Sequence, residues 1–168
     1  AKWHPKDIET KENWVKYNPT LSNEIFDDAG YYKNKNGFRE DKNGDPLSFD
    51  IIVVSGWSDW IRSAQVIAQN LKKIGIKAKV KTYDFGAWMS RMQKGEFDMA
   101  IGWGEKGTNP FPLYRGMMSS KYIKPIGKDA DANWHRFSTD EADSLLLQFE
   151  KTSDEIVIKD ILHKLQNI

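Results

Sequence analysis

The chain contains no cysteine, which excludes disulfide bonds and thiol chemistry. No apolar run approaches the roughly 20 residues that a membrane-spanning helix needs. The opening segment 1–14 has no apolar region of the kind found in signal peptides. Neither sign of charge dominates, because 25 basic residues oppose 24 acidic ones and leave a net charge of +1. This balance argues against nucleic acid as a partner.

Motifs for catalysis and metal binding are also missing. The histidines His4, His135 and His163 lie far apart and have no metal-ligand spacing. Residues 102–107, "GWGEKG", fit G-x-G-x-x-G, but they follow the third predicted strand and lead into a segment that does not open a helix at once. The turns "NKNG" and "DKNG" lack the first carboxylate of an EF-hand calcium loop. We therefore expect no catalytic group, no cofactor and no metal.

The sequence is rich in aromatic residues, with 7 Trp and 8 Phe among 168 residues, and it is long enough for a hydrophobic core. Apolar periodicity predicts its secondary structure. After an irregular lead-in at 1–20, helices are expected at 20–29, 58–74, 85–94, 112–119, 140–151 and 155–168, and strands at 48–54, 76–83, 97–103 and 133–137. The last helix has no stop signal, so the chain is expected to be truncated.

Local signals refine these elements. Ser58 is expected to cap the second helix, and Asp84, Thr139 or Asp140, and Asp154 are expected to cap later ones. Asn-Gly pairs at 36–37 and 43–44 predict tight turns between the first helix and the first strand. Two helical faces are expected to be apolar, one formed by Trp60, Ala64, Ile67, Leu71 and Ile74, the other by Phe85, Trp88, Met89 and Met92.

The alternation of strands and helices from 48 to 103 predicts a parallel sheet with helices on both faces. Such packing places the first strand between the second and the third, which creates a topological switch point at the carboxyl ends of the strands. Trp57 follows the first strand and Trp103 ends the third, so both indoles are expected at the mouth of one ligand crevice. Alternatively, both indoles simply cover the end of the sheet.

Several segments together resemble the family 5 extracellular solute-binding proteins of ABC importers. The resemblance begins in "NEIFDDAGYYKNKNGFRED" and "GDPLSFDIIV". It continues through "AQVIAQNLKKIGIKAKVKTYDFGAWMSRMQKGEFDMAIGWG" and "NWHRFSTDEADSLLLQFEKTSDEIVIKDILHKLQ". Each piece is ordinary, but their order from about residue 21 to the end is specific to the family.

The resemblance implies an α/β fold, namely one lobe of a type II periplasmic-binding protein with a mostly parallel central sheet. Residues 1–168 are then a single α/β lobe of a two-lobed receptor whose second lobe is missing from this chain. The implied partners are an oligosaccharide or peptide ligand, that second lobe and an ABC permease in the membrane. The implied location is extracellular or periplasmic, and the implied role is capture of a solute, not catalysis.

The ligand is the finer question. Peptide binders of the family often place an aspartate three residues after the Gly-Trp tryptophan, where this chain has Lys106 preceded by Glu105. The resemblance therefore favours an oligosaccharide over a peptide as the ligand, and nickel is less favoured than either. Two other classes of protein remain as alternatives, namely an enzyme on the same fold and an interaction module with no role in transport. The expected ligand-binding residues are Ser55, Gly56, Trp57, Trp103, Gly104, Asn109 and Tyr114.

Overall fold

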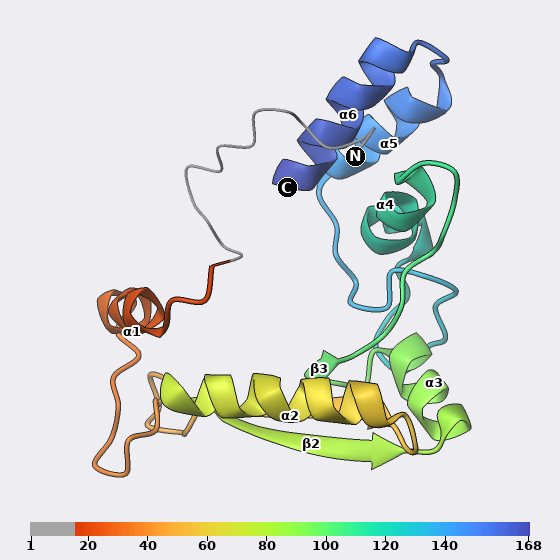
Figure 1. Ribbon diagram of the computed structural model, residues 1–168. Helices are drawn as coiled ribbons and strands as arrows, with labels where there is room; N and C mark the ends of the chain where they lie inside the picture. Colours follow the sequence, from red (N-terminus) through yellow and green to blue (C-terminus); the bar gives the residue numbers. More distant parts are fainter. Residues whose placement is uncertain (1–15) are drawn as a thin grey trace. The chain divides into compact units, whose positions relative to one another are not determined.

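A computed structural model describes residues 16–168 of the chain (Figure 1). These residues divide into two compact units. The sheet unit comprises residues 16–89 and 97–102, and the helical unit comprises residues 90–96 and 103–168. Most of the irregular lead-in expected at 1–20 lies outside the described residues, and the single lobe over 1–168 stays a prediction.

The sheet unit contains three strands in the order β2-β1-β3, and both pairings are parallel, as expected. The central strand β1 (Ser48–Val54) lies between β2 (Lys77–Tyr83) and the short β3 (Met99–Ala100). The four residues from Ile51 to Val54 are at most 3% exposed, so both faces of β1 are buried. This burial explains the unbroken apolar run of β1, whereas the edge strand β2 alternates with lysines.

Strand β3 is shorter than the strand expected at 97–103. Only Met99 and Ala100 pair with β1, and one more backbone bond runs from the amide of Ile101 to Ile52 O at 3.2 Å. Before β3, the carboxylate of Asp98 accepts a hydrogen bond from the amide of Asp50 at 2.9 Å. A side chain therefore takes the place of strand pairing at this end of β3.

Helix α2 (Ser58–Lys73) corrects two expectations. Ser58 is the first helical residue and not its cap; the N-cap position is Trp57, which makes no side-chain capping bond. Ala64 is fully buried and packs with Ile51 and Val53 of β1, joined by the partly buried Ile61. Ile67, which was expected on the same face, is 42% exposed because the sheet covers a narrower stripe of the helix.

Two further helices, α1 (Pro19–Asp28) in the sheet unit and α3 (Phe85–Lys94), whose residues 90–94 belong to the helical unit, confirm their boundary signals. Helix α1 ends before Gly30, whose φ of +83° suits glycine. Helix α3 begins just after Asp84, whose Oδ1 accepts a hydrogen bond from the amide of Ala87 at 2.9 Å. The expected apolar face of α3 is only partly correct, since Trp88 is fully buried but Phe85 is 48% exposed.

The turn region between α1 and β1 is organised around Arg39, which is fully buried. Its Nε donates to Ile74 O at 2.7 Å, at the end of α2. Its Nη1 donates to Tyr31 O and pairs with Asp27 Oδ1 at 2.6 Å, and its Nη2 donates to Asn23 Oδ1 at 2.8 Å. One guanidinium thus ties α1, the turn region and the end of α2 together.

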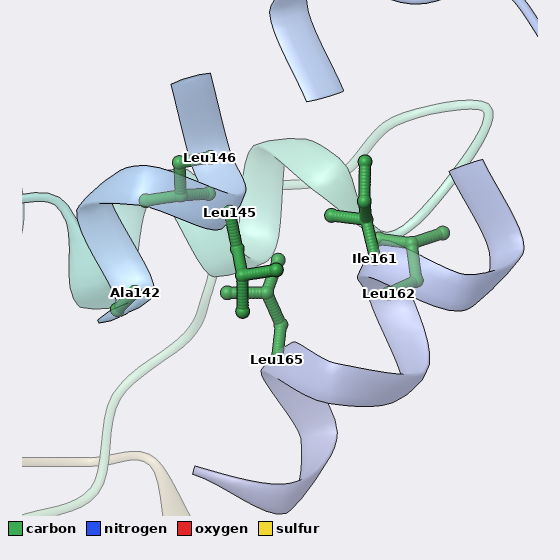
Figure 2. Packing of buried hydrophobic residues seen from close by; sticks show 6 residues of the cluster. All are labelled: Ala142, Leu145, Leu146, Ile161, Leu162 and Leu165. Atoms are coloured by element: carbon green, nitrogen blue, oxygen red, sulfur yellow. The ribbon is translucent and has the colours of Figure 1, made fainter. Parts of the chain in front are cut away.

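The helical unit contains α4 (Phe111–Met118), a short 3₁₀ turn (Ser120–Tyr122), α5 (Asp140–Glu150) and α6 (Glu155–Asn167). Helices α5 and α6 pack through the leucine-rich cluster in Figure 2, which consists of Ala142, Leu145, Leu146, Ile161, Leu162 and Leu165. Thr139 and Asp154 cap these helices through side-chain oxygens, as expected. Phe111 of α4 stacks on Phe149 of α5 with ring centroids 4.1 Å apart.

The strand expected at 133–137 is wrong, because this segment forms a turn. Asn133 and Arg136 adopt positive φ angles of 48° and 57°, which a strand does not allow. The buried amide of Asn133 donates to Ser119 O at 3.0 Å and to Phe137 O at 2.7 Å, and its Oδ1 accepts from the amide of Phe137. These bonds fold the segment back on itself.

Candidate functional site

The first group of expected ligand-binding residues follows β1 in the sheet unit. The amide of Ser55 donates to Tyr83 O at 2.6 Å, which extends the pairing of β1 with β2 by one residue. Gly56 has a φ of +82°, a conformation that favours glycine, and it turns the chain towards α2. Trp57 comes next and is 38% exposed. These three residues therefore lie at the carboxyl end of the central strand, as the sequence predicts.

Trp57 belongs to a cluster of four aromatic rings within the sheet unit. Its ring meets that of Trp60 edge-on, with centroids 4.6 Å apart and an interplanar angle of 81°. It also lies beside Phe85, with centroids 6.1 Å apart. The fully buried Trp88 contacts Trp60 and Phe85 at 6.0 and 6.1 Å. The cluster thus extends from a buried indole to two exposed rings.

Phe85 is not among the ligand-binding residues expected from the sequence, because its helical spacing groups it with Trp88 and the two methionines of α3. A signal was nevertheless present. Phe85 is the second residue after β2, and Trp57 is the third residue after β1, so each follows the carboxyl end of its strand closely. The carboxyl ends of neighbouring parallel strands are where open α/β sheets bind ligands.

The second group of expected residues belongs to the helical unit. Trp103 is 44% exposed and meets Trp134 edge-on, with ring centroids 6.1 Å apart. Gly104 has a packing role that the sequence did not suggest. A Cβ atom at Gly104 would lie 2.1 Å from Cδ1 of Leu113, so a side chain here would clash with α4.

Asn109 and Tyr114 lie at α4. The Oδ1 of Asn109 accepts a hydrogen bond from the amide of Phe111 at 2.9 Å and so helps to start this helix. Tyr114 is half-buried, and its ring packs against the α5–α6 cluster. Both side chains thus contribute to local structure, and their contact with a ligand stays a prediction.

The charged residues after Trp103 form an ion pair within the helical unit. Arg115 Nη2 lies 3.0 Å from Glu105 Oε2, and both side chains are about two-fifths exposed. The hydrogen bond that Arg115 donates to Glu105 raises the pKa of Arg115. Glu105 is therefore already engaged by a cation of this chain.

His135 lies in the turn at 133–137. Desolvation lowers the pKa of its ring, and the nearby Arg136 guanidinium lowers it further. A hydrogen bond with the Met117 backbone opposes this shift. The folded chain thus binds this proton less readily than the unfolded chain. The associated stability is lost as the pH falls from about 6.5 towards the lowered folded pKa. A nuclear magnetic resonance titration is expected to place the His135 midpoint below 6.5 in the folded chain and near 6.5 in urea. A folded midpoint at or above the urea value would contradict this.

Two absences hold for residues 16–168. No group of three or more histidine, aspartate or glutamate side chains there is arranged to hold a metal ion. No helix in this part of the chain has the length and apolar composition that crossing a bilayer requires.

The expected site residues thus fall into two sets in different units. Ser55, Gly56 and Trp57 lie in the sheet unit, while Trp103, Gly104, Asn109 and Tyr114 lie in the helical unit. The meeting of Trp57 with Trp103 at one ligand stays a prediction.

Comparison with known proteins identifies the family. The family described as bacterial extracellular solute-binding proteins, family 5 middle, matches residues 1–124. The chain belongs to this family, as its sequence resemblance indicates. Among curated relatives, the oligopeptide-binding protein AppA of Bacillus subtilis is 27% identical over 154 residues, which are 90% of this chain.

Solved structures confirm the fold. A periplasmic oligopeptide-binding protein of Thermotoga maritima, solved with bound mannohexaose, matches 98% of this chain with a TM-score of 0.88 and 29% identity. AppA of Bacillus subtilis, solved with a nonapeptide, matches 97% with a TM-score of 0.78 and 26% identity. The chain is therefore an α/β protein with the fold of type II periplasmic-binding proteins.

The matched relatives are much longer than this chain. It spans 26% of curated AppA and 31% of the Thermotoga maritima chain. The relatives are solute-binding receptors, and members of the family are periplasmic or extracellular.

Proposed function

We propose that this chain is part of a receptor that captures a neutral oligosaccharide outside the membrane and delivers it to an ABC permease. The observation that carries the proposal is the similarity to the mannohexaose-bound Thermotoga maritima protein over 98% of the chain. A longer polypeptide supplies the second lobe, in keeping with the share of its relatives that the chain spans. The role is binding and transport, not catalysis.

The choice of a sugar has support within the chain. Trp57 and Trp103 are 38% and 44% exposed, and flat indole faces suit the apolar C–H faces of sugar rings. Glu105 is paired with Arg115, which leaves it less suited to hold the α-amino group of a peptide. We propose Ser55, Gly56, Trp57, Trp103, Gly104, Asn109 and Tyr114 as the ligand-binding residues.

An oligopeptide is the alternative ligand. It is favoured by the matched protein AppA, whose structure contains a nonapeptide. The two ligand classes differ in charge. A peptide brings terminal charges that need partners, whereas a neutral sugar is held by ring stacking and hydrogen bonds.

Calorimetry on the full-length receptor with mannohexaose and with a nonapeptide tests the proposal. Mannohexaose is expected to bind, and Trp57→Ala or Trp103→Ala is expected to weaken its binding at least about tenfold, or ~1.4 kcal/mol, because each loses a stacking face. Trp57→Phe and Trp103→Phe are matched controls. Each keeps a flat ring and is expected to lose less mannohexaose affinity than the alanine variant.

The outcomes separate the ligand classes. Binding of the nonapeptide alone would favour the oligopeptide alternative. Unchanged mannohexaose affinity in both alanine variants would mean that the two indoles only cover the end of the sheet.

A further inference from the structure

Two aromatic residues leave neighbouring strands at the same edge of the sheet. Strands β1 and β2 are in register up to Val54 and Tyr83, and the Ser55 amide extends the pairing to Tyr83 O. Trp57 follows Val54 by three residues, and Phe85 follows Tyr83 by two. Their ring centroids are 6.1 Å apart and their planes differ by 31°, so the two rings are neighbours whose planes are tilted relative to each other.

Both rings are partly exposed to solvent. Phe85 is 48% exposed and Trp57 is 38% exposed, whereas Trp88, one turn further along α3, is fully buried. A helix that only needed to cover the sheet could carry a polar residue at its first position. An exposed apolar pair at the carboxyl ends of parallel strands instead indicates a binding surface.

The rings behind this pair hold it in place. Trp60 supports Trp57 edge-on at 4.6 Å, and Trp88 lies 6.1 Å from Phe85 and 6.0 Å from Trp60. Aromatic side chains held by packing lose little conformational entropy when a ligand binds. The exposed faces are therefore organised before the ligand arrives.

We infer that Trp57 and Phe85 form one aromatic platform on which consecutive sugar rings of a neutral oligosaccharide lie, and that Phe85 contacts the ligand directly. This inference rests on the proposed function and adds a residue to it. A sugar ring has an apolar C–H face and a rim of hydroxyl groups, so an open platform binds the face while the rim stays hydrated. An apolar peptide side chain, by contrast, is bound best in an enclosed pocket.

Calorimetry with mannohexaose on the full-length receptor tests Phe85. Phe85→Leu keeps an apolar side chain but removes the ring, and is expected to weaken binding about tenfold. Phe85→Tyr keeps the ring and is expected to bind within about twofold of the wild type. Tyr32→Leu is the matched control, because Tyr32 is a 66% exposed aromatic residue of the same unit outside the aromatic cluster; its affinity is expected to be unchanged.

The outcomes distinguish the platform from the proposed function. If the wild type and Phe85→Leu bind mannohexaose equally, the platform is wrong while the receptor proposal stands. If the wild type binds the nonapeptide and not mannohexaose, the sugar proposal and the platform both fail. If Phe85→Leu lowers the thermal midpoint of unfolding, Phe85→Met provides the same comparison without the ring. If Phe85→Tyr loses as much mannohexaose affinity as the ring-free variant, the ring has no role in binding.

Discussion

Replacing Arg39 by alanine is expected to lower the free energy of unfolding by about 3–5 kcal/mol, among the largest losses for any single substitution in the sheet unit. The side chain is fully buried, and its guanidinium donates to acceptors on Asn23, Tyr31 and Ile74 as well as to Asp27. Alanine would leave the part-buried acceptors on Asn23, Tyr31 and Ile74 without this donor and would open a cavity. Urea denaturation followed by circular dichroism measures the loss.

Three matched variants separate the contributions to this effect. Arg39→Lys keeps the charge but not the planar fork of donors, so most of the loss is expected to remain. Asp27→Asn keeps an acceptor oxygen but removes the negative charge of a side chain that is 53% exposed, and is expected to cost about 1 kcal/mol or less. Arg62→Ala, at an exposed position on α2, is expected to change stability by less than about 0.5 kcal/mol. A loss at Arg39 no larger than that at Arg62 would show that the guanidinium is not a structural centre.

The role of Arg39 could not be predicted from the sequence. It occurs in "GFRED", a charged segment between two Asn-Gly turns, and local patterns there favour the surface. Its acceptors come from α1, from the turn region and from the end of α2. A long-range network of this kind leaves no periodic signal, because no single segment shows that the others will surround the side chain.

Local sequence signals are sufficient to predict the helices and strands whose stability depends on residues nearby in the chain. The apolar run of β1, the alternation in β2 and the caps at Asp84, Thr139 and Asp154 all occur where expected. The same signals failed at 133–137, where the segment "NWHRF" resembles a short strand. There the amide of Asn133 bonds to Ser119, which lies 14 residues earlier in the chain.

The candidate site was predictable in part for the same reason. The strand order β2-β1-β3 follows from the alternation of elements, and it places Trp57 at the carboxyl end of the central strand. Phe85 was missed because helical spacing alone cannot say how far a sheet covers a helix. The local sequence around Tyr114 gives no sign that its ring packs against α5 and α6, because those helices come later in the chain.

Replacing Trp88 by alanine is expected to lower the free energy of unfolding by about 3–5 kcal/mol, because its large ring is fully buried and contacts both Trp60 and Phe85. Trp60→Ala is expected to cost less, since Trp60 is only half-buried, and Trp57→Ala less again. Trp88→Phe keeps most of the apolar area and is the matched control. Urea denaturation ranks the four variants.

This ranking also determines how the binding experiments are to be interpreted. If Trp88→Ala and Trp57→Ala cost the same, the cluster is one structural unit and a weaker affinity in Trp57 or Phe85 variants reflects a damaged fold. The expected result is a large stability loss at Trp88 with a small one at Trp57, and a large affinity loss at Trp57 and Phe85. Such opposite profiles arise only if the buried ring supports the sheet unit while the exposed rings, 38% and 48% accessible, bind the ligand.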